Sequence, residues 1–389
     1  MSLPTLVALA AAALPQAFAA SSQSFVPPAS SPFSASVNYV GQSNGSLPID
    51  PVKPGKVFDR FIQIWFENTD FSVANSTAEF RSLAERGILL SQYFAVTHPS
   101  QPNYAATIGG SFWGLADDNK HDIPSQIGTM VDLLELGGVS WAAYQENMPT
   151  DGFNGETFSS VNYVDPTAAN YTYYQRKHNP PILYDSVSGV PSRAARVRNF
   201  NDFAADVNTS ALPQWMFVTP NMVNDGHDTN VDFAAAFLRY WLEPLLADPR
   251  FNDGRTLVLV TFDETESYLH NNNVFAVLLG GAVPERLHGT VDSTYYTHYS
   301  AMSTVQANWG LGSLGRGDTD PVMSNVYSLV ANATGWKNND IAGSSIPLTN
   351  LIGLTPGPLN PLFFLQTGWP APNTSAVGAG GGPVFVGSG

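Results

Sequence analysis

The clearest pattern along the chain is a series of short, almost continuous apolar runs. They are rich in β-branched and aromatic residues, and each is short enough to be a single strand. We expect strands at 57–66, 139–145, 215–219, 256–262 and 274–280. Runs without alternating polar positions are typical of strands that are covered on both faces, as in a parallel sheet.

Longer segments with helix-like spacing separate these runs. We expect helices at 76–86, 126–136, 230–247 and 299–309. The alternation indicates an α/β fold with a doubly wound, mostly parallel sheet and helices on both faces. Because no linker-like composition interrupts residues 56–366, we expect them to form one large domain.

The two ends of the chain differ from this domain in composition. Residues 1–20 are apolar and end in Ala-Phe-Ala-Ala, which predicts a cleaved signal peptide and a secreted protein, extracellular or in the cell wall. A Ser/Pro-rich lead-in follows at 21–55, and a Gly-rich tail that we expect to be flexible occupies 367–389. No stretch reaches the ~18 apolar residues of a membrane span, so no stable membrane association is expected.

Composition narrows the classes of partner. The net charge is -15 with only 17 Lys and Arg, which argues against nucleic acid and against an anionic membrane surface. Cysteine is absent, so thiol chemistry and Cys-ligated metals are excluded. Six N-x-Ser/Thr sequons favour a glycosylated surface: Asn44, Asn75, Asn170, Asn208, Asn332 and Asn373.

Polar clusters follow four of the five predicted strands without an intervening turn. They are Glu67-Asn68, Glu146-Asn147, residues 221–228 and Asp263-Glu264. Carboxyl ends of parallel strands build the ligand sites of open α/β sheets, so we expect these acids to converge. A solvated strand cap is the plainer interpretation of either pair alone. Together Glu67-Asn68 and Asp263-Glu264 offer three carboxylates and an amide oxygen, a set that suits a divalent metal ion.

Ser100 lies in the segment THPSQPNYAATIGG, residues 97–110. Prolines bracket Ser100 and Gln101, and a helix is predicted to begin near Asn103, where its positive end would favour a phosphate oxyanion. A serine before a helix is usually only an N-cap. A nearby metal ion would change that interpretation, because it can make the hydroxyl a nucleophile toward phosphorus.

Four of the seven histidines lie near these clusters: His98, His178, His227 and His298. Each alone is more often structural than catalytic, although histidine can hold a phosphate or protonate a leaving alkoxide. The chain has no glycine-rich nucleotide loop, no Gly-x-Ser-x-Gly elbow and no His-Glu-x-x-His helix. These absences argue against an ATPase, an α/β-hydrolase esterase and a zincin protease.

The motifs in this order resemble a known family. They are ENTDF (67–71), THPSQPNY (97–104), WAAYQENMP (141–149), KHNPP (177–181), LPQWMFVTPNMVNDGHD (212–228) and TFDETES (261–267). Over about residues 57–310 the chain is similar to the phosphoesterase family that holds secreted acid phosphatases and phospholipases C, and it looks most like the fungal acid phosphatases. The resemblance implies an alkaline-phosphatase-like fold and makes 56–366 the catalytic domain.

The resemblance also implies roles for individual residues. One divalent metal ion of unknown identity would be bound by Glu67, Asn68, Ser100, Asp263 and Glu264, with Ser100 also the nucleophile. The longer Glu264, where bacterial relatives have a second aspartate, puts its role in doubt. His98, Asn103 and His178 would bind phosphate, and His227 or His298 would protonate the leaving group. Asp225, His227, Asp228 and His298 fall where two-metal relatives have a second ion, which we leave open.

The expected function is therefore that of a secreted, metal-dependent acid phosphatase acting on small phosphate monoesters through a phosphoserine. Two alternatives stay open at this point. A phospholipase C or other phosphodiesterase would use the same site, and a catalytically silent secreted glycoprotein would keep only the fold. The sequence does not indicate the oligomeric state.

Overall fold

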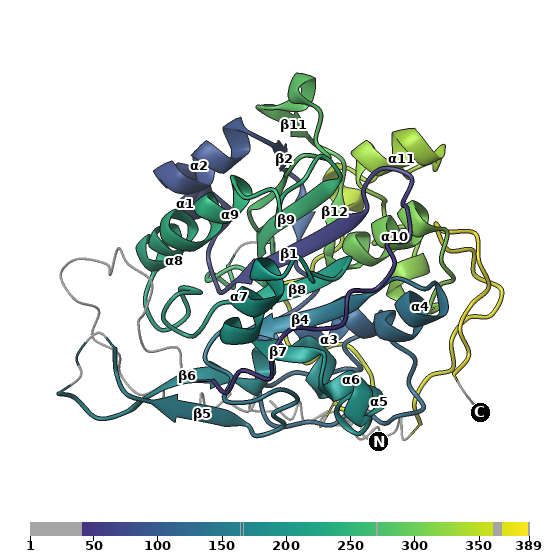
Figure 1. Cartoon of the computed structure of the whole chain (residues 1–389). Helices are drawn as coiled ribbons and strands as arrows, with labels where there is room; N and C mark the ends of the chain where they lie inside the picture. Colours follow the sequence, from purple (N-terminus) through teal and green to yellow (C-terminus); the bar gives the residue numbers. More distant parts are fainter. Residues whose placement is uncertain (1–40, 164, 166, 270, 361–367, 388–389) are drawn as a thin grey trace, which may run out of the picture.

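The computed structural model describes residues 41–163, 165, 167–269, 271–360 and 368–387. Its centre is an eight-stranded sheet (Figure 1). In spatial order the strands are β11 (Thr290–Asp292), β2 (Ile88–Leu90), β10 (Ala276–Leu279), β9 (Thr256–Phe262), β1 (Arg60–Phe66), β8 (Trp215–Thr219), β4 (Trp141–Gln145) and β7 (Val197–Asn199). The predicted signal peptide and the first part of the lead-in, up to residue 40, lie outside the described residues.

Most neighbouring strands of this sheet run parallel. The pairs β9–β1, β1–β8, β8–β4, β4–β7 and β11–β2 are parallel, and β10 is antiparallel to both β9 and β2. All seven residues of β9 are buried, which is why its sequence TLVLVTF shows no polar alternation. The five predicted strands and the mostly parallel α/β architecture are confirmed.

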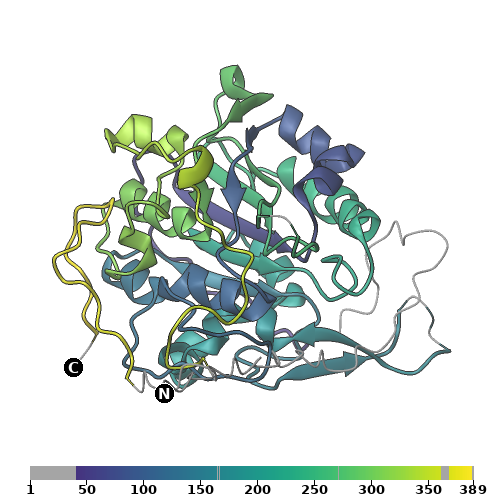
Figure 2. The same cartoon turned by 180° about the vertical axis from the view of Figure 1, so that it is seen from behind.

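Helices cover both faces of the sheet (Figures 1 and 2). Trp65 contacts Tyr104 and the His298 ring on one face, whereas the next residue, Phe66, contacts Phe80 and Phe237 on the other. Alternation along the strand therefore separates two cores. One face carries α3 (Ser100–Gly109), α4 (Met130–Leu136), α10 (His298–Trp309) and α11 (Ser328–Thr334); the other carries α1 (Phe71–Ser76), α2 (Ala78–Glu85), α7 (Phe200–Asn208), α8 (Val231–Phe237) and α9 (Glu243–Leu246).

Small elements complete the described fold. Two short pairs of strands are β3 (Tyr93–Phe94) with β12 (Tyr296–Thr297), and β5 (Thr157–Ser160) with β6 (Tyr171–Gln175). The single-turn helices are α5 (Asp185–Ser188), α6 (Pro191–Ala194), η1 (Arg176–His178), η2 (Pro180–Leu183), η4 (Glu285–Leu287), η5 (Gly317–Thr319) and η6 (Gly343–Ser345). No helix among the described residues has both the length and the apolar character to cross a membrane.

Three predicted helices differ from expectation, and one of them is the segment 126–136, where α4 begins only at Met130. The helix expected near Asn103 begins at Ser100, because Pro102 falls in the first turn, where a missing N–H breaks no helical hydrogen bond. The segment predicted as one helix at 230–247 is α8, a π-helical turn η3 (Leu238–Leu242) and α9. Pro244 cannot donate to the turn before it, which accounts for the wider turn there.

The described parts of both terminal segments pack against the domain. In the lead-in, the Lys53 amide donates to Gln214 Oε1 at 2.9 Å, and the Lys53 ammonium donates to the Gly137 carbonyl. The composition predicts a flexible tail, but Phe385 N donates to Ser313 O at 2.7 Å and Ser313 N donates to Pro383 O at 3.2 Å. Phe385 is partly buried against the core, and this apolar contact explains why the segment is held.

Asn308, which is buried in α10, fixes the chain where it enters β1. Its side-chain oxygen accepts from Val57 N and Phe58 N, and its Nδ2 donates to Phe58 O at 2.9 Å. Replacing Asn308 with Ala would leave these backbone groups buried without partners, so we expect a loss of about 3 kcal/mol in the free energy of unfolding. Urea denaturation measures this loss. The exposed Gln126→Ala variant should stay within about 0.5 kcal/mol of the parent protein.

Candidate active site

The candidate site lies where the four central strands β9, β1, β8 and β4 end together. Parallel pairing brings Glu67, Asp263 and the 221–228 loop to one edge of the sheet. Glu146 directly follows β4 at the same edge but has a different use. Its carboxylate accepts from Asn221 N and from Asn224 Nδ2, each at 2.9 Å, and so holds the 221–228 loop in place.

The Ser100 side chain contacts both residues of the Glu67-Asn68 pair. Its hydroxyl donates to Glu67 Oε2 at 3.0 Å and lies 3.5 Å from Asn68 Oδ1. Asp263 Oδ1 accepts from Asn68 N at 3.1 Å and from Glu264 N at 2.7 Å. With the Asn68 amide turned over, its nitrogen would lie 3.3 Å from Asp263 Oδ1 and 3.2 Å from Glu67 Oε2. Ser100, Glu67, Asn68 and Asp263 therefore form one contiguous group.

The other oxygen of Glu67 has different neighbours. Oε1 accepts a hydrogen bond from the Tyr104 hydroxyl and lies 3.3 Å from His178 Nε2. The second nitrogen of His178 lies 3.7 Å from Asp225 Oδ2. One ligand atom from each of Glu67, His178 and His227 lies within 4.8 Å of the other two, a separation that a single metal ion could bridge.

His227 is bound on both sides of its ring. Nδ1 lies 2.8 Å from Asp228 Oδ1, and Nε2 lies 3.2 Å from the Lys177 ammonium. An ammonium can only donate, so Nε2 is the acceptor and the ring proton lies on Nδ1, facing Asp228. The tautomer of His227 is therefore fixed by its two neighbours.

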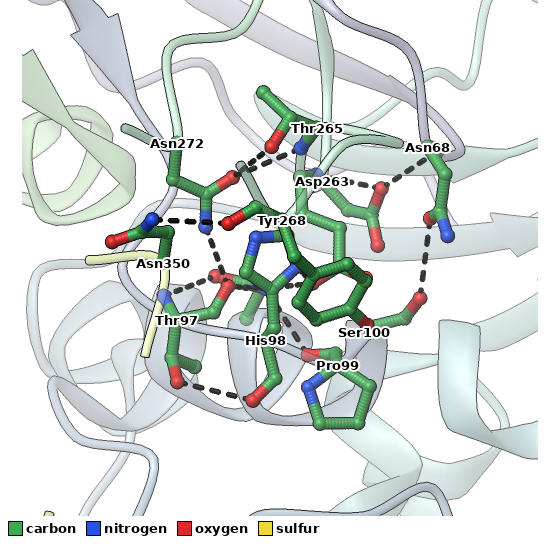
Figure 3. A network of polar contacts seen from close by, with 12 residues as sticks. Asn68, Thr97, His98, Pro99, Ser100, Asp263, Thr265, Tyr268, Asn272 and Asn350 are labelled. Atoms are coloured by element: carbon green, nitrogen blue, oxygen red, sulfur yellow. Dashed lines mark hydrogen bonds and ion pairs between the residues drawn. The ribbon is translucent and has the colours of Figure 1, made fainter. Parts of the chain in front are cut away.

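Glu264 belongs to a second group of side chains beside the first. Its Oε2 lies 2.8 Å from His98 Nδ1 and accepts from Asn103 Nδ2 at 3.2 Å. The Asn103 oxygen accepts from Val96 N and Thr97 N, so this side chain also shapes the loop before Ser100. Figure 3 shows the Tyr268 ring lying over His98, with 4.0 Å between the ring centroids.

Burial raises the pKa of these acids, although the charge of Lys177 lowers it at Glu67, Asp225 and Glu264. Desolvation is the largest cause at each acid, and the charge of Asp263 adds to it at Glu67 and Glu264. The pKa of Asp263 rises to about 6 because of burial, and that of Asp225 rises for the same reason. Asp263 Oδ2, Glu264 Oε1 and Asp225 Oδ2 are buried and have no hydrogen-bond partner among the described residues. Buried, unpaired carboxylate oxygens beside imidazole nitrogens suit a divalent cation.

Comparison with known proteins agrees with the motifs. The model of the phosphoesterase family matches residues 69–312. The chain is 45% identical to the "Acid phosphatase" of Aspergillus fumigatus, over 80% of this chain and 68% of that protein. The chain belongs to the phosphoesterase family. It is accordingly a phosphoric-ester hydrolase, and the resemblance stated from the sequence is confirmed.

Other relatives of this phosphoesterase carry related names. The chain is 42% identical to the "Phosphate-repressible acid phosphatase" of Penicillium chrysogenum, over 85% of this chain and 76% of that protein. A protein of the alkaline phosphatase superfamily from Vibrio parahaemolyticus is similar at a TM-score of 0.42 and 10% identity, covering 70% of this chain and 72% of its own. A likeness of that size does not locate site residues.

His298 lies behind the acids of the phosphoesterase site. Its Nε2 donates to the Asp263 carbonyl at 2.6 Å, its Nδ1 accepts from the Tyr93 hydroxyl at 3.3 Å, and its ring packs against Trp65. Burial lowers the pKa of His298 to about 3. With both nitrogens in use, the ring supports Asp263, and this geometry does not suit the leaving-group role that the sequence suggested for it.

Three further side chains belong to the site. Tyr104 lies four residues after Ser100, so helical spacing places both on one face of α3 and could have revealed it. Lys177 precedes His178 within the motif KHNPP. Asp118 accepts from Lys177 at 2.9 Å and from Gln101 N at 2.9 Å, a pairing that no sequence spacing indicates.

Asp263→Asn should separate the effects of charge and metal. In metal-free protein the Asn oxygen keeps both backbone hydrogen bonds, and the lost charge relieves repulsion with Glu67. We expect the free energy of unfolding to rise by roughly 1–3 kcal/mol in EDTA. With a divalent metal added, the order of stability should reverse, because Asp263 is one of the expected metal ligands. Thermal melts in both conditions test this; lower stability than the parent in both would contradict the expectation.

The pH dependence of the metal-free protein follows from the same acid. Asp263 titrates near 6 in the fold but near ~3.9 in an unfolded chain, so the folded state binds the proton more tightly. Its contribution to stability is therefore present below about pH 4 and lost as the pH rises through 6. The stability of the parent minus that of Asp263→Asn should fall between pH 4 and 7 in EDTA. A difference that rises with pH would refute the assignment.

Proposed function

We propose that the protein is a secreted, metal-dependent acid phosphatase that hydrolyses phosphate monoesters through a phosphoserine at Ser100. The observation that carries the proposal is the contact of the Ser100 hydroxyl with Glu67 Oε2 at 3.0 Å, among buried acids at the end of β1 and β9. The names of the fungal relatives, acid phosphatases at 41–45% identity, support the substrate class.

The proposed metal ligands are Glu67, Asn68, Asp263 and Ser100. When bound there, a divalent ion would act as a Lewis acid toward a phosphoryl oxygen and favour the ionised Ser100 hydroxyl. Glu264 is directed toward His98 and Asn103, so we assign it to positioning those side chains. We propose one ion, because Lys177 donates to the His227 nitrogen that a second ion would need.

The protein supplies the remaining chemistry through its own side chains. Glu67 Oε2 lies where it can take the Ser100 proton, and Ser100 is the first residue of α3, whose positive end favours the phosphoryl anion. The Ser100 oxygen forms a bond to phosphorus while the bond from phosphorus to the alcohol oxygen breaks. Water then attacks phosphorus, which releases inorganic phosphate and restores Ser100.

His227 is the proposed acid for the departing alcohol. It is partly exposed, with 24% of its side chain accessible. Because Nε2 accepts from Lys177 in the structure, the acid role requires that Nε2 take up a proton and that Lys177 turn from it to the phosphoryl group. Asp228 would then stabilise the protonated ring from the Nδ1 side.

His98 and His178 are proposed to contact the phosphate. Burial lowers the pKa of both, so each would act as a neutral ring with one N–H donor. For His98 this requires that Glu264, whose pKa burial raises, donate its proton to Nδ1, which leaves the N–H on Nε2 for the phosphate.

Secretion and glycosylation complete the proposal. Secretion rests on residues 1–20, which lie outside the described part of the chain. Among the sequons, Asn44, Asn170, Asn208, Asn332 and Asn373 are exposed, and Asn75 is half-buried within α1. An exposed asparagine is accessible to the modifying enzyme, so we propose the five exposed positions as the glycosylated ones.

Ser100→Ala tests the covalent route. We expect kcat/KM for p-nitrophenyl phosphate to fall on the order of 10⁴-fold, because the nucleophile is removed while the fold keeps its packing. Rapid quenching of the parent enzyme with a phosphomonoester should leave a phosphoryl group on the peptide that contains Ser100. Ser82→Ala, on α2, is the matched control and should keep full activity.

The alternatives are distinguished by the same preparation. A phospholipase C would favour p-nitrophenyl phosphorylcholine over p-nitrophenyl phosphate. A silent glycoprotein would turn over neither ester and would hold no metal when measured by mass spectrometry. Undiminished turnover by Ser100→Ala would refute the phosphoserine.

A further inference from the structure

Lys177 brings a positive charge into a site otherwise rich in acids. It lies in η1, between Arg176 and His178, and 13% of its side chain is accessible. Arg176 anchors this turn, because its guanidinium donates to the His121 and Ile182 carbonyls and to Asp122. The backbone that carries Lys177 is therefore held firmly, and the side chain points toward the site.

Two of the three Lys177 N–H groups have partners in the described part of the chain. One donates to Asp118 Oδ2 at 2.9 Å and another to His227 Nε2 at 3.2 Å. An ammonium group has three donors, so one remains for a ligand. Burial acts to lower the pKa of Lys177, but the charges of Asp118 and Glu67 raise it above its ordinary value, which keeps the ammonium charged.

Asp118 connects this ammonium to the nucleophile. Its Oδ2 accepts from Lys177, and its Oδ1 accepts from the amide of Gln101, the residue after Ser100, at 2.9 Å. The Gln101 side chain donates to the Asn119 carbonyl at 2.7 Å, which ties the same loop to α3 a second time. The two carboxylate oxygens of Asp118 thus link Lys177 to the residue after Ser100, and these two hydrogen bonds set the position of Lys177 relative to Ser100.

We propose that Lys177 binds a charged non-bridging oxygen of the phosphoryl group and makes the site selective for monoesters over diesters. This inference rests on the proposed function. A monoester dianion has three non-bridging oxygens sharing two charges, whereas a diester has two sharing one. The additional anionic oxygen must have a cation or donor in a site whose acids would otherwise repel it. The third N–H of Lys177 is such a donor, and Asp118 is the residue that positions it.

The test compares two esters with one leaving group. We expect Lys177→Met to lower kcat/KM for p-nitrophenyl phosphate about 100-fold, because a charge-assisted hydrogen bond is lost. The kcat/KM for bis(p-nitrophenyl) phosphate should change less than about 3-fold. Lys120→Met removes the same charge from an exposed position near Asp118 in sequence, and should change neither value more than about 2-fold.

A binding measurement accompanies the rates. The inhibition constant of inorganic phosphate should rise about 100-fold in Lys177→Met, while the metal content measured by mass spectrometry stays that of the parent. If diester turnover is too slow to follow, this constant decides the question. Asp118→Asn keeps the Lys177 ammonium but fixes its position less firmly. We therefore expect kcat/KM for p-nitrophenyl phosphate and the affinity for inorganic phosphate each to fall about 10-fold, with no such loss for the diester. This variant also serves if Lys177→Met fails to fold.

The outcomes separate the two proposals. A parent enzyme that hydrolyses neither ester would refute the proposed function. An active parent whose Lys177→Met variant loses both esters equally, or keeps its affinity for phosphate, would refute the inference alone. In that case Lys177 would only offset the charge of the buried acids.

Discussion

The structure depends on the burial of several carboxylates at one edge of its sheet. Glu67, Asp225, Asp263 and Glu264 are almost inaccessible to solvent, and desolvation raises the pKa of each. Such groups destabilise a fold unless a cation or protons offset their charge. Four such groups kept together suit a ligand that brings positive charge, and Lys177 already brings one such charge to their edge of the sheet.

The surroundings hold these acids in fixed positions. The Asp263 backbone accepts from His298, whose ring is packed between Trp65 and Tyr93. Glu146 holds the loop that carries Asp225 through its bonds to Asn221 and Asn224. The contacts of Asp263 come from α10, β1 and β3, and those of the Asp225 loop come from turn residues that follow β4 and β8. Together they hold the acids close to one another despite their repulsion. That rigidity is the structural condition for presenting a reactive group to phosphorus in one orientation.

The sequence predicted the strands and the convergence of the acids, because both follow from local patterns. Continuous apolar runs identified the buried strands, and an acid placed directly after such a run must lie at the edge of a parallel sheet. The direction of individual side chains could not be predicted in the same way. Glu264 follows Asp263 but turns to His98, and His298 begins a helix but faces the back of the site. Those directions are set by neighbours distant in sequence, such as Asn103 and Tyr93.

The two oxygens of Glu67 divide the site into halves with different chemistry. Oε2 accepts from the Ser100 hydroxyl, whereas Oε1 faces Tyr104 and His178. His227 adjoins the second half, and its ring is fixed between Asp228 and Lys177. An attacking oxygen and a leaving oxygen must lie on opposite sides of phosphorus for in-line displacement. In the proposed mechanism, a carboxylate that separates the serine from the imidazole would place attack in the Ser100 half and departure toward His227. His298 faces neither half, so the proposal assigns the proton transfer to His227 alone.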